Sequence, residues 1–211
     1  MSKFQDFPGQ PSETELVSII ASRICHDLIS PLGAIGNGVE LLNLNGTAGN
    51  NPELSLIAAS VEQAQARVRF FRIAFGDFSA EQLMKPAEAR SILSGLFREA
   101  RLSVTWDLEA PRPRQEVKLI FLLIQCLETT LPWSGTVVIR SEGEGWAIDA
   151  QAARLQVNRD LWACVSASGE PCITSPQVVQ FALAGRQSAA LPGTLDVWFG
   201  DSDIHIRYLP H

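Results

Sequence analysis

The segment ASRICHDLISPLGAI, residues 21–35, places one imidazole and one carboxylate on a mostly apolar helix. Apolar residues around it recur at spacings of three and four, which is typical of one helix face. They are Val17, Ile20, Ile24, Leu28, Pro31, Ile35, Val39 and Leu42. Ser12 and Glu15 form a capping-box pattern where the helix is expected to begin. Because Pro31 lacks a backbone N–H, we expect a kink just past His26.

A second apolar repeat follows a turn. N-G and G-N-N-P between residues 45 and 52 are strong turn signals. The next repeat is strictly three-four-three-four, as in a coiled-coil seam, and consists of Leu54, Ile57, Val61, Ala64, Val68, Phe71 and Phe75. Two helices joined by a short turn predict an antiparallel hairpin. Because a pair alone buries its apolar faces incompletely, we expect two copies to form a homodimeric four-helix bundle.

The pattern changes after residue 78. Helices are predicted at 87–100, 115–131, 159–166 and 175–186, and strands at 102–108, 136–141, 145–150, 153–157, 194–199 and 203–209. This mixture predicts the α+β class, with a C-terminal two-layer α/β sandwich after the hairpin. We therefore expect a flexible leader at 1–11, a helical hairpin at 12–78 and a second domain at 86–211.

Charge and composition exclude several kinds of protein. The net charge of -6 and the scattered basic residues argue against nucleic-acid binding. No uncharged apolar run reaches the roughly 18 to 20 residues of a membrane span, and no signal-peptide segment occurs. We therefore expect a cytoplasmic protein that is not associated with a membrane. The four cysteines lack metal-ligand spacing and the three histidines are far apart, so we expect no metal site.

A helical wheel separates His26 from the apolar stripe. At about 100° per residue, His26 lies about 165° from the centre of the stripe. Most of its neighbours on the same face are small and would admit another protein's surface. Together with Arg23, they form the predicted partner-docking face: Ser22, Ile29, Ser30, Gly33 and Asn37. An exposed histidine on the polar side of a helix can equally have no role.

Imidazole chemistry suits this position. One ring nitrogen of a neutral imidazole is free to act as a nucleophile. A carboxylate bonded to the other nitrogen fixes the tautomer and the ring orientation. Asp27 is the candidate for this orienting role, although adjacent residues diverge by about 100° on a helix. His26 is therefore the candidate catalytic residue.

A family resemblance rests on these same residues. The sequence HDLISPL, residues 26–32, is similar to the phospho-acceptor box of two-component histidine kinases. The longer string SRICHDLISPLGAIGNGVELL, residues 22–42, resembles the ChpT family of bacterial histidine phosphotransferases. The resemblance implies a dimer whose hairpins form a four-helix bundle, and a C-terminal domain similar to the histidine-kinase ATPase fold.

The second domain lacks the nucleotide motifs of a working kinase. Gln125 stands where the kinase-like pattern would place Asn, and neither D-x-G-x-G nor G-x-G-x-G occurs at the expected places. An Asn holds Mg²⁺ and glycine-rich loops let the backbone approach phosphates, so these absences argue against ATP binding or hydrolysis. We expect a degenerate ATPase-like domain with no cofactor of its own.

The resemblance implies a phosphorelay protein. His26 would take a phosphoryl group from the receiver domain of a hybrid histidine kinase and pass it to response regulators in cell-cycle signalling. Mg²⁺ would come from the receiver. Two alternatives stay open at this point: a diverged histidine kinase, and a non-catalytic dimeric adaptor that binds receivers.

Overall fold

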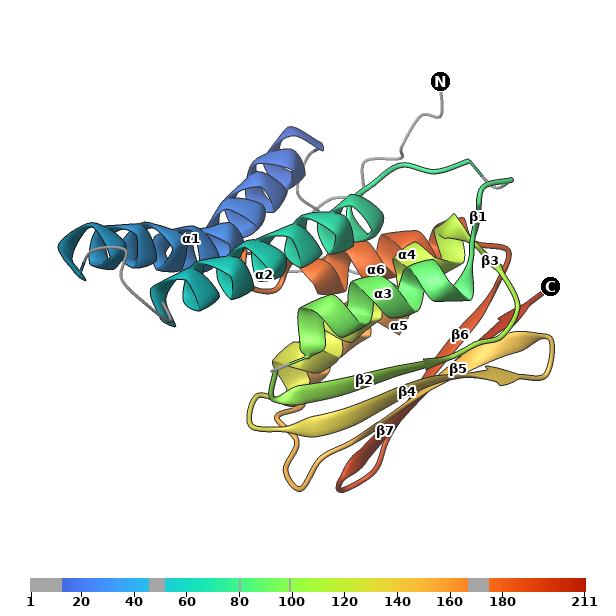
Figure 1. Ribbon diagram of the computed structural model, residues 1–211. Coiled ribbons are helices and arrows are strands. Elements are labelled where there is room, and N and C mark those ends of the chain that lie inside the picture. The colour runs from blue at the N-terminus through green and yellow to red at the C-terminus, as the bar shows by residue number, and fades with distance from the viewer. Residues whose placement is uncertain (1–12, 46–51, 80, 99, 167–174) are drawn as a thin grey trace.

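The N-terminal part of the chain is a helical hairpin. The computed structural model describes residues 13–45, 52–79, 81–98, 100–166 and 175–211. Helix α1 (Glu13–Asn45) and helix α2 (Pro52–Ala74) run antiparallel and project away from the rest of the molecule (Figure 1). The predicted leader at 1–11 lies outside the described residues. The hairpin itself is confirmed.

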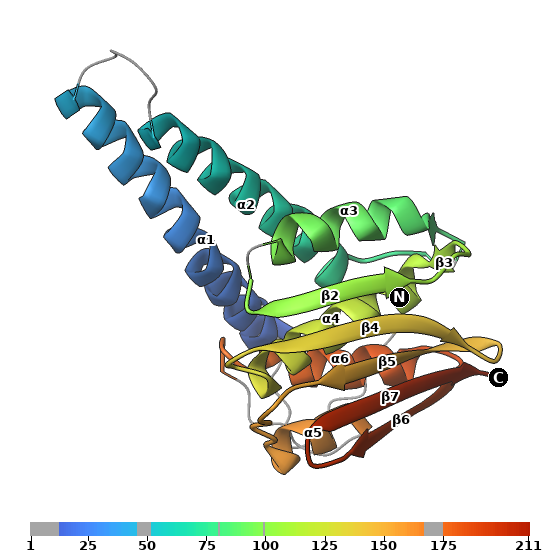
Figure 2. The same ribbon diagram turned by 60° about the horizontal axis from the view of Figure 1, so that its bottom comes forward.

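The second domain is built on a five-stranded sheet with helices on one face. Its helices are α3 (Pro86–Phe97), α4 (Arg114–Thr130), α5 (Arg159–Ser166) and α6 (Val179–Ala190). Its strands are β1 (Leu83–Met84), β2 (Leu102–Asp107), β3 (Arg112–Pro113), β4 (Gly135–Glu142), β5 (Gly145–Gln151), β6 (Gly193–Phe199) and β7 (Asp203–Pro210). The five-stranded sheet has the strand order β2-β4-β5-β7-β6, and Figure 2 shows these strands side by side in that order. The predicted α+β class with a two-layer second domain is confirmed.

The sheet is mostly antiparallel. Strand β2 pairs with β4 in parallel, and the three other neighbouring pairs are antiparallel. Strands β1 and β3 form a separate two-stranded antiparallel ladder, with Leu83 opposite Pro113. The sequence did not predict this small ladder, because a two-residue strand is too short to show a period-two alternation.

Helix α4 forms the centre of the core. Val117 and every residue from Leu119 to Leu127 are buried. The sheet covers one side of this helix, α2 and α6 pack against it, and α3 packs on α2 (Figures 1 and 2). A helix that is apolar all round is expected in such a fully enclosed position.

Two predicted elements differ from the structure. Residues 153–157 form no strand, because the chain leaves the sheet after Gln151 and the Gln156 N–H donates to the Thr130 carbonyl at the end of α4 at 2.9 Å. Helix α6 begins at Val179 and not at 175, since a turn precedes it in which the Val178 N–H donates to the Ser175 carbonyl at 3.0 Å.

The end of α2 belongs to the core of the second domain. Phe70, Ile73 and Ala74 are buried in the same cluster as α4. The Phe70 ring stacks on Phe121 with a centroid distance of 4.8 Å. The two predicted domains are therefore packed on each other through α2, and the boundary between residues 78 and 86 stays a prediction.

Much of the predicted hairpin seam is exposed within one protomer. Val17 and Val39 on α1, and Leu54 and Val68 on α2, are each more than 40% exposed. Only the C-terminal part of the α2 repeat, at Phe71, is buried. Association into a dimeric bundle, which would cover this surface, stays a prediction.

One stretch of the described residues, Glu15–Leu42 of α1, is long and apolar enough by length and composition to cross a membrane. The expectation from sequence excluded such a segment because it required an uncharged run, and this stretch passes once its few charged residues are tolerated. Its mean hydropathy of 1.2 and its position near the N-terminus make it weak evidence for a span.

Candidate functional site

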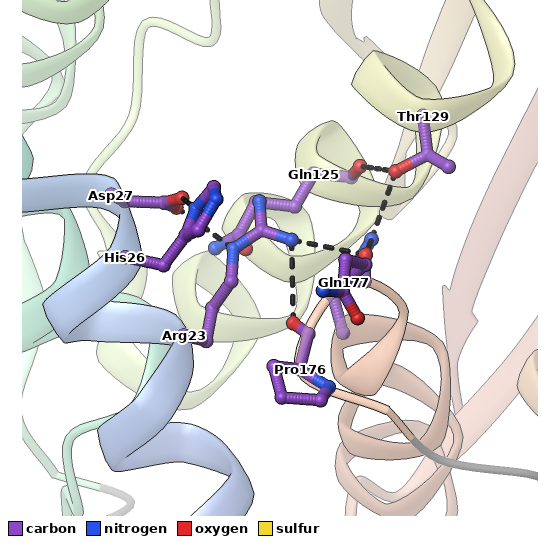
Figure 3. Close-up of polar contacts among 8 residues, drawn as sticks. Arg23, His26, Asp27, Gln125, Thr129, Pro176 and Gln177 are labelled. Carbon is purple, nitrogen blue, oxygen red and sulfur yellow. Dashed lines mark hydrogen bonds and ion pairs between the residues drawn. The ribbon is translucent and has the colours of Figure 1, made fainter. Parts of the chain in front are cut away.

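The imidazole of His26 projects from α1 beside Asp27 and Arg23 (Figure 3). Its side chain is 74% exposed, as the helical wheel predicts. Nδ1 lies 3.1 Å from Asp27 Oδ1. A protonated Nδ1 donates to that carboxylate, which leaves Nε2 without a proton in the neutral ring. The histidine thus presents one nucleophilic nitrogen at an open surface.

Asp27 is much more sheltered than its neighbour. Its side chain is only 13% exposed. While Oδ1 lies against His26, Oδ2 accepts a hydrogen bond from Arg23 Nε at 2.8 Å. Residues four apart share a helix face, which allows this ion pair. Both oxygens of the carboxylate are therefore occupied, and the side chain can hold the imidazole as the sequence predicts.

Arg23 also forms hydrogen bonds with the second domain of its own chain. Its Nη1 donates to the backbone carbonyl of Gln177 at 3.0 Å and approaches that of Pro176 at 3.4 Å (Figure 3). These carbonyls precede α6 in the second domain. Arg23 was predicted on the partner-docking face, and its contact with the second domain was not predicted. No local pattern reveals a contact between residues so far apart in the chain.

The other residues of the predicted docking face are exposed. They are Ser22, Ile29, Ser30, Gly33 and Asn37. Ile29 is an apolar side chain with 67% exposure. A Cβ added at Gly33 would meet no atom within 4 Å, so the surface there is open. The face that carries His26 is accessible in this protomer, and its role in docking stays a prediction.

Pro31 lies inside α1 and is buried. The ribbon of α1 changes direction part-way along its length (Figure 1). A proline inside a helix removes one backbone hydrogen bond, which is a common cause of such a bend. The assignment of the bend to Pro31 stays a prediction.

A cleft of about 890 Å³ lies between the hairpin and the second domain, beside Asp27. Gln125 forms part of its wall and is 3% exposed, and its side-chain amide has no hydrogen-bond partner among the described residues. Desolvation raises the pKa of Glu128, another lining residue, while the positive charges of Arg23 and Arg67 act in the opposite direction. The described residues contain no group of three or more His, Cys, Asp or Glu able to hold a metal ion.

Comparisons with known proteins agree on one family. A model of the histidine phosphotransferase C-terminal domain matches residues 86–201. The protein phosphotransferase ChpT of Brucella abortus (strain 2308) is 36% identical over 138 residues. That alignment covers 64% of this chain and 65% of the relative, just under two thirds of its length.

Solved structures extend the comparison to the hairpin. The structure of a bacterial phosphotransferase matches with a TM-score of 0.79 and 27% identity, over 97% of this chain and 100% of that one. The Acinetobacter baumannii histidine kinase AdeS matches with a TM-score of 0.45 and 13% identity, over 87% of this chain and 95% of that one. The second likeness is too weak to bear on the fold.

The family match begins at the first residue of α3 and spans more than half of the chain. The resemblance to the ChpT family, inferred from residues 22–42, is confirmed by the sequence relative and by the bacterial phosphotransferase structure. The chain therefore belongs to the histidine phosphotransferase family, and it is a ChpT-like member.

Proposed function

We propose that this protein relays phosphoryl groups between receiver domains through His26. The observation that carries the proposal is the exposed imidazole whose Nδ1 contacts Asp27, so that Nε2 is available to a partner. Family membership supports the same activity. The partners are the receiver domain of a hybrid histidine kinase and the response regulators that accept the phosphoryl group.

The transfer is a displacement at phosphorus. The lone pair of His26 Nε2 attacks the phosphorus of a phospho-aspartate on the donor receiver. The bond between phosphorus and the aspartate oxygen breaks, and its electron pair stays on the donor's carboxylate. A carboxylate of the second receiver then attacks the phosphohistidine and returns the electron pair to Nε2. Asp27 stabilises the positive ring through Nδ1–H.

The receiver is expected to supply Mg²⁺ and the remaining catalytic groups. This protein would contribute the nucleophile, its orienting carboxylate and an open surface of small residues. The second domain is expected to bind no ATP, as the absent nucleotide motifs predict.

The test follows labelled phosphate from a phosphorylated receiver onto the purified protein. The wild type should acquire acid-labile, base-stable label, and His26→Ala should acquire none. His211→Ala is the matched control, because it removes an exposed imidazole far from α1 in sequence and should accept label normally. Transfer to His26→Ala would disprove the proposal. Label from ATP alone would favour a histidine kinase, and receiver binding without label would favour an adaptor.

We also propose that the active form is a homodimer. The exposed apolar residues of the hairpin, including Val17, Val39, Leu54 and Val68, support this because monomeric proteins rarely leave a long apolar stripe uncovered. A second hairpin would complete a four-helix bundle.

We propose a cytoplasmic location on the same ground. The apolar stretch of α1 packs along α2, and its charged pair Arg23–Asp27 is held against the second domain. A dimer accounts for the remaining apolar surface without a bilayer. The full chain should stay in the soluble fraction after cell lysis and high-speed centrifugation, and recovery with the membranes would contradict this.

A further inference from the structure

The Arg23–Asp27 pair is protected while its neighbour His26 is open. The two side chains are 17% and 13% exposed, compared with 74% for the imidazole. A charge-assisted bond of 2.8 Å joins Arg23 Nε to Asp27 Oδ2. Ion pairs sheltered from water are less screened than surface pairs and hold a more defined geometry. The carboxylate that faces the imidazole is thus fixed from behind.

The second domain holds the far end of the same guanidinium. Arg23 Nη1 donates to the Gln177 carbonyl at 3.0 Å, with the Pro176 carbonyl at 3.4 Å. Backbone carbonyls are anchored by the main chain, so they offer a firmer support than another flexible side chain would. The planar guanidinium donates in two directions at once, which suits it to bridge a carboxylate and a carbonyl.

The support continues into the domain core. The Gln177 carbonyl also accepts a bond from the Gln180 side chain at 3.1 Å. Gln180 is fully buried and donates to Thr129 Oγ1 at 2.9 Å, and Thr129 in turn donates to the Gln125 carbonyl of α4 at 3.1 Å. A continuous series of hydrogen bonds therefore leads from α4 to the imidazole (Figure 3).

We propose that Arg23 is a positioning residue through which the second domain sets the orientation and tautomer of His26. Asp27 diverges from His26 by about 100° on the helix, so its carboxylate reaches the ring only in a suitable side-chain conformation. Arg23 selects that conformation. The fixed carboxylate then keeps the proton on Nδ1 and leaves the lone pair on Nε2.

This inference gives the second domain a part in the chemistry without a nucleotide. It deepens the proposed phosphoryl transfer, and its effect on rate rests on that function. Its effect on the imidazole does not, because the tautomer is a property of the unphosphorylated protein. The two can therefore be tested apart.

The first test reads the tautomer by NMR in the full-length protein. Ring nitrogen and carbon shifts distinguish Nδ1–H from Nε2–H, and the chain has only three histidines to assign. The wild type should show His26 mainly as Nδ1–H. Arg23→Met keeps an unbranched side chain that reaches about as far as Nε but removes the guanidinium donors, and it should shift the neutral ring towards Nε2–H. Arg23→Lys keeps the charge without the planar fork and should restore the wild-type signal only in part.

A matched control lies elsewhere in the chain. Arg90 makes the same kind of bridge, with Nε donating to the Trp106 carbonyl at 3.0 Å and Nη2 to Glu109 at 2.9 Å. Arg90→Met should leave the His26 signal unchanged. Thr129→Val cuts the series of bonds from the other end and should shift His26 in the same direction as Arg23→Met, but less. If the His26 signal is the same in the wild type and all of these variants, the inference is wrong.

The second test measures phosphoryl transfer in a double-mutant cycle. Arg23→Met should slow labelling of His26 about 10-fold, the lower end of the range for residues that orient a functional group. Asp27→Asn should slow it further. Because Arg23 acts through Asp27, Arg23→Met should cost almost nothing more in the Asp27→Asn background. Independent, multiplying effects would refute the positioning role.

The two proposals fail in different ways. If the tautomer shifts as expected but His26→Ala still carries label, the positioning inference holds and the proposed function fails. If His26 carries the label but its tautomer ignores Arg23, the function holds and the inference fails. Circular dichroism on each variant verifies the fold. If Arg23→Met does not fold, the tautomer of His26 in Arg23→Lys and Thr129→Val tests the inference in its place.

Discussion

Helices α4 and α1 contain similar apolar residues, but α4 is buried in the core and α1 is largely exposed. In α4, Val117 and all residues from Leu119 to Leu127 are buried. In α1, only Leu16, Pro31 and Gly38 are buried among the residues whose burial is described. The second domain thus completes its own core. The hairpin keeps surplus apolar surface on one side and the histidine on another, and the proposed dimerisation and docking would use these two surfaces.

The largest effect should come from the enclosed helix. Phe121→Ala removes a fully buried ring that stacks on Phe70, and it should lower the free energy of unfolding by about 3–5 kcal/mol. Urea unfolding measures this loss. Leu83→Ala, at a side chain that is 58% exposed in β1, should change stability by less than about 0.5 kcal/mol. Equal losses would mean that α4 is not the core.

The next largest effect should come from the exposed apolar surface of the hairpin. Leu54 is 54% exposed in one protomer and lies on the predicted seam. Leu54→Ser should weaken dimerisation about 100-fold, because two copies lose about 1.5 kcal/mol of apolar burial each. Analytical ultracentrifugation measures the association constant. Leu83→Ser removes an equally exposed leucine away from the hairpin and should leave association unchanged. A dimer unaffected by Leu54→Ser would refute the proposed seam.

A third prediction compares a buried hydrogen bond with an exposed one. Trp162 Nε1 donates to Thr130 Oγ1 at 3.1 Å, and that hydroxyl donates to the Cys126 carbonyl at 2.8 Å. Thr130→Val removes this buried acceptor and should cost about 1–3 kcal/mol of stability. The contact of Thr194 with His211 is exposed, so Thr194→Val should cost much less, and chemical denaturation of both variants checks the difference. Similar costs would contradict the assigned burial.

The smallest effect is a dependence on pH at the start of α4. Desolvation raises the pKa of Glu116 above 4.5, while Arg112 acts in the opposite direction. In the pH range between the unfolded and folded pKa values, the native state holds a proton that the unfolded chain has released. Stability therefore falls as the pH rises through this range. The wild type should lose stability relative to Glu116→Gln from pH 4.5 upward, as measured by denaturation at several pH values. A difference that does not vary with pH would contradict the raised pKa.

Local sequence patterns were sufficient for most of the elements. The apolar period of three and four predicts the hairpin, and the alternation at 102–108 predicts β2 because its side chains face the core and solvent in turn. The pattern at 153–157 misled, since a strand also needs a neighbouring strand to pair with, and Gln156 bonds instead to the end of α4. The two-residue strands β1 and β3 carry too little pattern to be recognised.

The candidate site also has one part that the sequence predicts and another that it does not. His26 and Asp27 are neighbours in sequence, and the helical wheel was enough to predict an exposed imidazole. The wheel does not show that Asp27 is sheltered or that both of its oxygens are occupied. Arg23 looked like a surface residue because its partners, Pro176 and Gln177, are about 150 residues away in the chain.

The sequence by itself determined the two helices, the alternating strands, the class of fold and the histidine with its adjacent carboxylate, because each is encoded by residues within one or two helical turns. Only the tertiary structure decided the strand order, the enclosure of α4 and the contact of Arg23 with the second domain. Those features depend on segments distant in sequence that are brought together by burial of a common core. The support behind His26 belongs to this second group.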